Sequence, residues 1–199
     1  MDFFQKIKEV LVKPSRFFSE MEKEKTIKPS IIYISILTVF YSVMSIILLL
    51  LFKDTLTSFF LNMFNLPVEQ PFSLSKQLIF IIIGIPASIL FSFVIAAGLY
   101  VWLMIFGSDK DYKTAYKLLV YSETPSLLFG WIPIVNWFSW IYSLILLITG
   151  THKIYKFSKL KSSLIYIIPL GILLILLLIL FVMFSLILIS LSGQIPQSF

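Results

Sequence analysis

The chain has 199 residues, of which 59% are hydrophobic and 13% are charged, against roughly 45–50% and 25% in ordinary soluble domains. Three stretches, residues 30–52, 77–106 and 162–199, carry no charge over more than the roughly 18 residues that indicate a membrane helix. The composition therefore predicts an all-α, polytopic membrane protein and excludes a soluble domain. The net charge of +6 requires no nucleic-acid partner, because basic residues of membrane proteins gather in cytoplasmic loops.

Residues 1–29 precede the first apolar stretch and carry charges of both signs. We expect them to form a cytosolic amphipathic segment in front of a membrane domain at residues 30–199, because apolar residues recur there at helical spacing. These residues are Phe3, Phe4, Ile7, Val10 and Leu11. Two placements remain open: a helix lying on the inner leaflet and attracted by anionic lipids, or a helix packed on the protein's own cytosolic loops.

The uncharged stretch at residues 124–151 is long enough for one helix or for a hairpin of two short ones. Lys and Arg number seven in residues 1–29, three in 107–117 and four in 152–161, against two in 53–76. A hairpin keeps the first three groups on one side, as the enrichment of basic residues in cytoplasmic loops favours. The charge pattern therefore predicts a hairpin.

A turn signal supports this interpretation, because Pro133 and Asn136 are breaker residues that lie among Trp131, Trp137 and Trp140. We predict five membrane segments, with the N-terminus in the cytosol and the C-terminus outside the cell membrane. The segments lie at about 30–52, 77–106, 115–132, 137–151 and 163–191. The third and fourth are short for a roughly 30 Å hydrocarbon core, so they either cross the membrane or re-enter it.

Few residues could carry catalytic chemistry. The chain has one histidine, His152, and no cysteine. It contains no HExxH motif, no glycine-rich phosphate loop and no nucleophile elbow. We therefore expect a protein that is not an enzyme, with no catalytic residue, no metal and no cofactor.

The stretch YSETP, residues 121–125, contains a carboxylate at the start of an apolar run. In one interpretation a helix ends before it, Thr124 is an N-cap and Pro125 is the first residue of the next helix. In another, one helix continues and Pro125 kinks it. A sharper hypothesis pairs Glu123 with Lys153 or Lys156 of the basic loop, which the hairpin returns to the same membrane face.

Three stretches carry a family resemblance: KPSRFFSEM at residues 13–21, DYKTAYKLLVYSETPSLL at 111–128, and WIYSLILLITGTHKIYKFSKLKSSL at 140–164. Together they resemble the Yip domain family, the Yip-one or Ypt/Rab-interacting membrane proteins. The motifs are a Tyr-x-x-x-Pro step, here Tyr121 and Pro125, and a glycine followed by basic residues. The second motif is formed by Gly150, His152 and Lys153.

The resemblance implies five membrane segments, a cytosolic N-terminus and an outer C-terminus. In eukaryotic members it also implies binding of Rab-type GTPases and a part in vesicle traffic. The 29 residues before the first apolar stretch are much shorter than the N-terminal region of those members. The chain therefore resembles a prokaryotic member, and a Rab partner is implied only by family analogy.

Two functions fit these observations. The leading hypothesis is a non-enzymatic module for membrane binding or organisation, with a trafficking-like role, that acts through its basic cytosolic face. Its partners are anionic inner-leaflet lipids and an unidentified protein, with possible homo-oligomers. The alternative is a small transporter or channel that uses Glu123. The candidate residues are Tyr121, Glu123, Pro125, Gly150, His152, Lys153 and Lys156.

Overall fold

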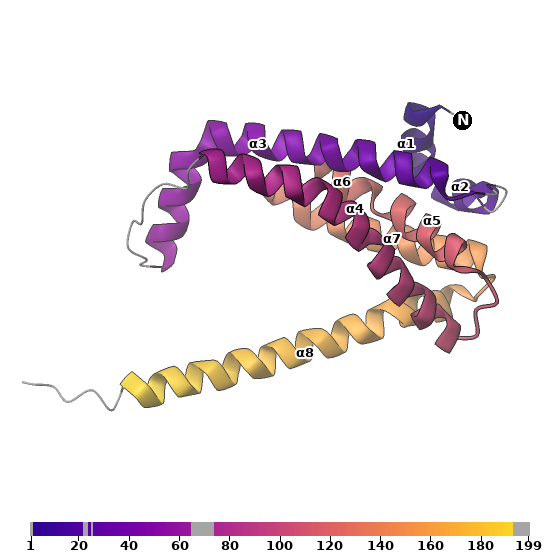
Figure 1. Ribbon diagram of the computed structural model, residues 1–199. Helices are drawn as coiled ribbons and strands as arrows, with labels where there is room; N and C mark the ends of the chain where they lie inside the picture. The colour runs from indigo at the N-terminus through magenta and orange to yellow at the C-terminus, as the bar shows by residue number, and fades with distance from the viewer. Residues whose placement is uncertain (1, 22–23, 25, 65–73, 193–199) are drawn as a thin grey trace, which may run out of the picture. The chain divides into compact units, whose positions relative to one another are not determined.

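A computed structural model of the protein describes residues 2–21, 24, 26–64 and 74–192, and these ranges are helical and contain no strand (Figure 1). The helices are α1 (Phe3–Val12), α2 (Pro14–Met21), α3 (Lys28–Phe64), α4 (Leu74–Ile105), α5 (Tyr112–Ser122), α6 (Thr124–Phe129), α7 (Pro133–Ile154) and α8 (Lys159–Ser192). The all-α class predicted from composition is confirmed.

The chain divides into two compact units, Met1–Phe157 and Ser158–Phe199. The described part of the second unit is a single helix, α8, in which every residue from 171 to 184 is exposed. Its side chains there are almost all Leu, Ile, Val, Phe or Met, as in a helix surrounded by lipid. The C-terminal end, which we expect outside the membrane, lies beyond the described residues.

Four described helices are long and apolar enough to cross a membrane: α3, α4, α7 and α8. The chain is therefore built as a polytopic membrane protein. The third predicted segment, at residues 115–132, is instead divided between α5 and α6, which have 11 and 6 residues. At about 1.5 Å per residue neither could cross a roughly 30 Å core, so five segments remain a prediction.

The division between α5 and α6 follows from Pro125, which has no amide hydrogen to donate to the carbonyl of Tyr121 four residues earlier. The Thr124 hydroxyl donates to that carbonyl instead, at 2.7 Å. Two helices therefore meet at Glu123, as the first interpretation of YSETP expected. The detail differs, because Thr124 is the first residue of α6 and Glu123 occupies the N-cap position without a capping hydrogen bond from its side chain.

In the first unit, α3 and α4 run side by side (Figure 1), and α5 contacts α3, α4 and α7. These neighbours bury nine successive residues, 114–122, although they include a lysine and several hydroxyl groups. The third predicted membrane segment thus contains the longest run of successive buried residues in the described chain. Its surroundings are protein rather than lipid.

The two N-terminal helices cover this centre, with α2 on α7 and α1 on α2 and α6. Pro14 separates them and stands at the start of α2, where proline is favoured. Val10, Phe17 and Phe18 are buried, so much of the apolar surface packs on the protein, but on helices α6 and α7 rather than on the cytosolic loops of the second placement. Phe4 remains 75% exposed, and contact of this segment with lipid stays a prediction.

Candidate functional site

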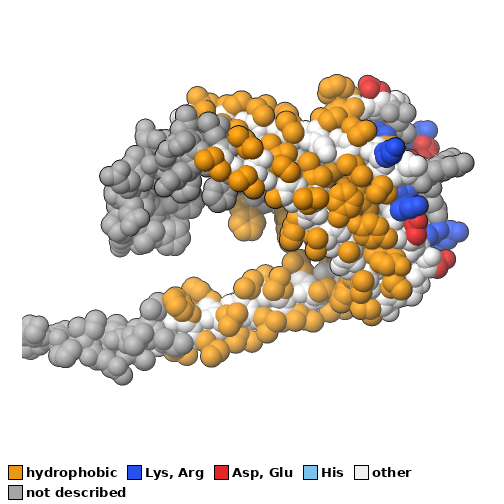
Figure 2. All heavy atoms as spheres, in the orientation of Figure 1, with side chains coloured by type: hydrophobic (Ala, Val, Ile, Leu, Met, Phe, Trp, Pro, Cys, Tyr) orange, Lys and Arg blue, Asp and Glu red, His pale blue; other side chains and the backbone are white. Residues whose placement is uncertain are grey.

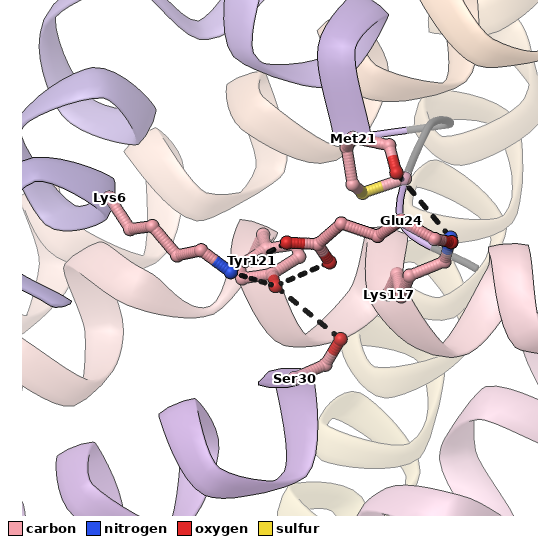
Figure 3. Close-up of polar contacts among 6 residues, drawn as sticks. All are labelled: Lys6, Met21, Glu24, Ser30, Lys117 and Tyr121. Atoms are coloured by element: carbon pink, nitrogen blue, oxygen red, sulfur yellow. Dashed lines mark hydrogen bonds and ion pairs between the residues drawn. The ribbon is translucent and has the colours of Figure 1, made fainter. Parts of the chain in front are cut away.

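Tyr121, the tyrosine of the Tyr-x-x-x-Pro step, lies fully buried at the centre of a polar cluster (Figure 3). Its hydroxyl donates to Oε2 of Glu24 at 2.9 Å and accepts from Nζ of Lys6 at 3.2 Å. Oγ of Ser30 donates to the same hydroxyl at 3.5 Å. One phenol therefore joins three segments: α1, the chain before α3, and the first turn of α3.

Lys6 and Glu24 form an ion pair of 2.6 Å above that phenol, with side chains only 11% and 24% exposed. Nζ of Lys6 also lies 5.4 Å from the centroid of the Tyr121 ring, within the range of a cation–π interaction. Burial raises the pKa of Tyr121, and the negative charge of Glu24 adds to the rise against the hydrogen bond from Ser30. The phenol therefore stays protonated and remains a donor.

Lys117 lies one helical turn before Tyr121 and is 4% exposed. Its Nζ donates to the carbonyl of Glu24 at 2.7 Å and to that of Met21, the last residue of α2, at 3.4 Å. The last carbonyls of a helix lack partners within the helix and carry partial negative charge. The buried ammonium therefore stabilises the end of α2. We call Lys6, Glu24, Ser30, Lys117 and Tyr121 the Tyr121 cluster.

Aromatic rings enclose the cluster. The ring of Tyr121 meets Phe17 and Tyr33 edge-on, with centroids 4.9 and 5.1 Å apart. The hydroxyls of Tyr33 and Thr124 are 2.9 Å apart. Because Thr124 gives its one hydrogen to the Tyr121 carbonyl, Tyr33 must be the donor. The Tyr-x-x-x-Pro step is thereby fixed from both its phenol and its backbone.

Gly150, the glycine of the second motif, lies where α7 meets α2 and α5. A Cβ at this position would overlap the side chain of Leu118 and lie 3.1 Å from the ring of Phe18. Leu118 and Phe18 are themselves fully buried, so they have little room to move. Glycine therefore permits the close packing of these three helices.

Glu123 is half-buried at the junction of α5 and α6, outside the four candidate spans. Its side chain is hydrogen-bonded to Ser126. Oγ of Ser126 lies 2.8 Å from Oγ of Ser143 on α7. In the described part of the chain Glu123 forms no ion pair with Lys153 or Lys156, so the structure does not contain the hypothesised pairing.

The remaining candidate residues close the end of α7. Nδ1 of His152 lies 2.6 Å from the carbonyl oxygen of Phe157. Lys156 has a φ of +55°, the left-handed conformation common just after a helix end. Lys153 and Lys156 are both exposed. The structure therefore brings Tyr121, Pro125 and Gly150 into one packed region and leaves the two lysines on the surface.

Sequence reasoning singled out Tyr121 but missed its partners. Lys6 and Lys117 were counted only as charges of cytosolic segments, and Glu24 lies in the mixed run EKEK. One signal was available for Lys117, because residues at i and i+4 share a helix face and Lys117 precedes Tyr121 by four. Glu24 precedes Tyr121 by about a hundred residues, so no local sequence pattern indicates their contact.

The long apolar helices and the buried polar centre define a polytopic α-helical membrane protein. A family model described as the Yip1 domain matches residues 8–193. The chain belongs to the Yip1 domain family, as the resemblance of its motifs indicated. No curated protein and no solved structure matches it. The family match does not test a prokaryotic origin.

Proposed function

We propose that the protein is a non-enzymatic module that binds and organises the membrane through a basic face on the cytosolic side. The basic face consists of the exposed lysines of the first unit. They are Lys8, Lys13, Lys28, Lys113, Lys153 and Lys156. In this proposal the N-terminus is cytosolic, the protein resides in the cell membrane, and the face attracts anionic lipids of the inner leaflet.

The observation that supports the proposal is a difference in burial among the basic residues. Lys6 and Lys117 are enclosed in the Tyr121 cluster, whereas the lysines of the basic face extend into solvent. Figure 2 shows charged side chains gathered over α1, α2 and α5, and apolar side chains along α3 and α4. The contact of Gly150 with Phe18 and Leu118 brings the end of α7, with Lys153 and Lys156, to this same region.

Electrostatics gives the basic face enough attraction to be measured. Each basic residue near an anionic membrane surface contributes about 1 kcal/mol. Nearby acidic residues lower the net positive charge of the basic face. One basic side chain, Arg16, is paired with Glu20 at 2.9 Å. Several lysines together should therefore enrich anionic lipids around the protein, and salt should weaken that enrichment.

The test is replacement of Lys8, Lys113, Lys153 and Lys156 by glutamine, with the same four positions changed to arginine as the matched control. Lipids that remain bound after mild solubilisation are identified by native mass spectrometry. We expect the glutamine variant to lose most bound anionic lipid and the arginine variant to retain it. Equal anionic lipid on both variants, with unchanged thermal unfolding, would contradict the proposal.

The family analogy with trafficking proteins adds a protein partner of unknown identity, and a Rab-type GTPase is the partner that analogy names. Crosslinking in the native membrane followed by pull-down tests this part separately. A partner that docks on the basic face should be lost from the glutamine variant and kept by the arginine variant. A partner recovered equally from both would bind elsewhere.

A second candidate function is a small transporter or channel that uses Glu123. The observation that favours it is the hydroxyl series beside the carboxylate: Ser126 is hydrogen-bonded to Ser143, and Oγ of buried Ser122 has no hydrogen-bond partner in the described structure. Glu123→Gln should then abolish a cation or proton flux into liposomes. A wild-type flux that survives Glu123→Gln, or no flux in the wild type, would eliminate this candidate.

A further inference from the structure

Helix α1 marks the level of one membrane surface. Asp2, Lys8 and Lys13 at and around this helix are exposed, and exposed charges are too costly to lie in the hydrocarbon core. Figure 1 shows α1 beside the first turns of α3. Distances into the bilayer can therefore be measured along other helices from the points at which they contact α1.

Two tyrosines provide such points. The ring of Tyr33 on α3 lies 5.4 Å from the ring of Phe3. On α7, the hydroxyl of Tyr142 donates to the carbonyl of Leu11. The two contacts fall near opposite ends of α1, and Figure 1 shows this helix lying across the direction of α3, so both ends are at similar levels along α3. The two helices can therefore be compared from similar starting levels.

The two helices continue for very different lengths beyond α1. From Tyr33, α3 runs through uncharged sequence to Phe52, 19 residues further, or about 28 Å of helix. This length matches a hydrocarbon core of roughly 30 Å. From Tyr142, α7 has only nine residues before it begins at Pro133, or about 14 Å. A tilt of α7 from the membrane normal would only reduce the depth that Pro133 reaches.

The other arm of the hairpin has a similar reach. Tyr121 is tied to α1 through Lys6 at 3.2 Å, and α6 ends eight residues later at Phe129, about 12 Å further if helical throughout. Both arms thus extend about half as far as α3. The turn between α6 and α7 therefore cannot reach the opposite surface that α3 reaches.

We propose that the hairpin enters and leaves the membrane on the α1 face, with its tip among the acyl chains. Exposed apolar side chains at the tip provide the lipid contact. They are Ile134, Trp137, Phe138 and Trp140, with exposures of 78%, 73%, 69% and 48%. Trp131 donates its indole N–H to the carbonyl of Leu128 at 2.8 Å, which satisfies one polar group at the tip internally. This inference does not depend on the function of the basic face.

Because the chain contains no cysteine, the test can use single cysteines in an otherwise native protein. Ile134→Cys and Asn136→Cys probe the tip. Gln70→Cys lies between the first two predicted membrane segments, in sequence that the charge pattern predicts outside, and Lys156→Cys lies on the α1 face. Each variant is exposed to a membrane-impermeant maleimide in intact cells, in inverted vesicles and after solubilisation in detergent.

The proposal expects both tip cysteines to resist labelling from either side and to react fully in detergent, while Gln70→Cys reacts in intact cells and Lys156→Cys in inverted vesicles. Labelling of the tip in intact cells at the Gln70→Cys rate would show a full crossing and overturn the proposal. Labelling of the tip in inverted vesicles at the Lys156→Cys rate would show that the hairpin stays outside the membrane, and would overturn it equally.

A spin label at Ile134→Cys in the reconstituted protein measures depth directly. We expect high accessibility to oxygen and low accessibility to a water-soluble nickel complex, as for a position among acyl chains. High accessibility to the nickel complex would place the tip at a headgroup layer and contradict the inference. Unchanged thermal unfolding of the labelled protein serves as the folding control.

Discussion

Helix α5 buries polar side chains, whereas helix α8 exposes apolar ones. In α5, residues 114–122 are all buried and include Lys117, two tyrosines and a serine. In α8, residues 171–184 are all exposed and almost purely apolar. In a soluble protein the apolar helix would be inside. Here the surrounding lipid solvates α8, while protein donors and acceptors solvate the polar groups of α5.

The difference indicates where specificity resides in this fold. An apolar helix in lipid is interchangeable with many others, because its surroundings make no directional demands. A buried lysine or tyrosine requires partners in defined positions. The particular contacts that define the first unit therefore concentrate around α5, and the following predictions test that contrast in order of expected effect.

The largest effect should come from exchanging the characters of the two helices. Leu178→Lys puts a charge near the middle of α8, where a lysine costs about 2.5–3.5 kcal/mol, and should reduce membrane insertion of α8 by about a hundredfold in a glycosylation-mapping assay. Lys117→Leu should lower the stability of the first unit, because each carbonyl left without a donor costs about 1–3 kcal/mol. Normal membrane insertion of α8 in the Leu178→Lys variant would contradict the proposed contrast between α5 and α8.

A smaller effect is expected from Gly150→Ala, because the added Cβ would overlap Leu118. Overpacking of this kind costs about 1–3 kcal/mol, which should appear as a lower thermal unfolding temperature in detergent. Gly98→Ala is the matched control, since nothing lies within 4 Å of a Cβ at that exposed position. Equal unfolding temperatures for the two variants would show that the contact around Gly150 is not restrictive.

Tyr121→Phe removes the hydroxyl that joins Lys6, Glu24 and Ser30. A hydrogen bond to a charged group contributes about 1.5–3 kcal/mol, and compensation by the remaining Lys6–Glu24 pair should keep the loss near the lower value. Limited proteolysis should also cut more rapidly between α2 and α3. Tyr41→Phe, at a half-buried position of α3, is the control. Unchanged cutting in Tyr121→Phe would mean that the phenol does not hold the N-terminal helices.

The smallest effect concerns the cap of α5. Oδ1 of Asp111 accepts from the amide of Thr114 at 3.0 Å and from its hydroxyl at 2.6 Å. The bond from Thr114 chiefly lowers the pKa of Asp111. This stabilisation is therefore complete above the ordinary pKa of 3.8 and is lost as pH falls through the lower folded-state value.

Asp111→Ala should cost about 1 kcal/mol at neutral pH, as loss of an N-cap usually does. The difference from the wild type should disappear in acid, where the wild-type carboxylate is protonated. Denaturant unfolding in detergent across the acidic range measures this, and Asp109→Ala at a neighbouring exposed position is the control. A difference that persists at the lowest pH would exclude the carboxylate as its source.

The sequence predicted the long helices well, because uncharged runs and flanking charges are direct consequences of the bilayer. The runs at 30–52 and 163–191 lie in α3 and α8, and the run at 77–106 lies in α4 except for its last residue. The turn predicted at Pro133 is the start of α7. The third segment was less predictable, because an apolar sequence resembles a membrane helix whether lipid or protein surrounds it.

The candidate site was predictable only in part. The break at Pro125 and the importance of Gly150 follow from local stereochemistry, which sequence reveals. The proposed pairing of Glu123 with the basic loop considered charge and membrane side but not distance. The structure instead hydrogen-bonds Glu123 to Ser126 in the first turn of α6. It also places Lys6 beside Glu24, in a contact that depends on how α1 packs against the rest of the first unit.

The Tyr121 cluster also sets an order of events during synthesis. Lys6 bonds to a residue 115 positions later, and Glu24 to one 97 positions later. At a translation rate of about 5–20 residues per second, α1 and α2 must wait roughly 5 to 20 seconds for that partner. Throughout that interval the Lys6–Glu24 pair lacks the phenol that joins it to α5, so the first two helices can hold only their contacts with each other and with α3.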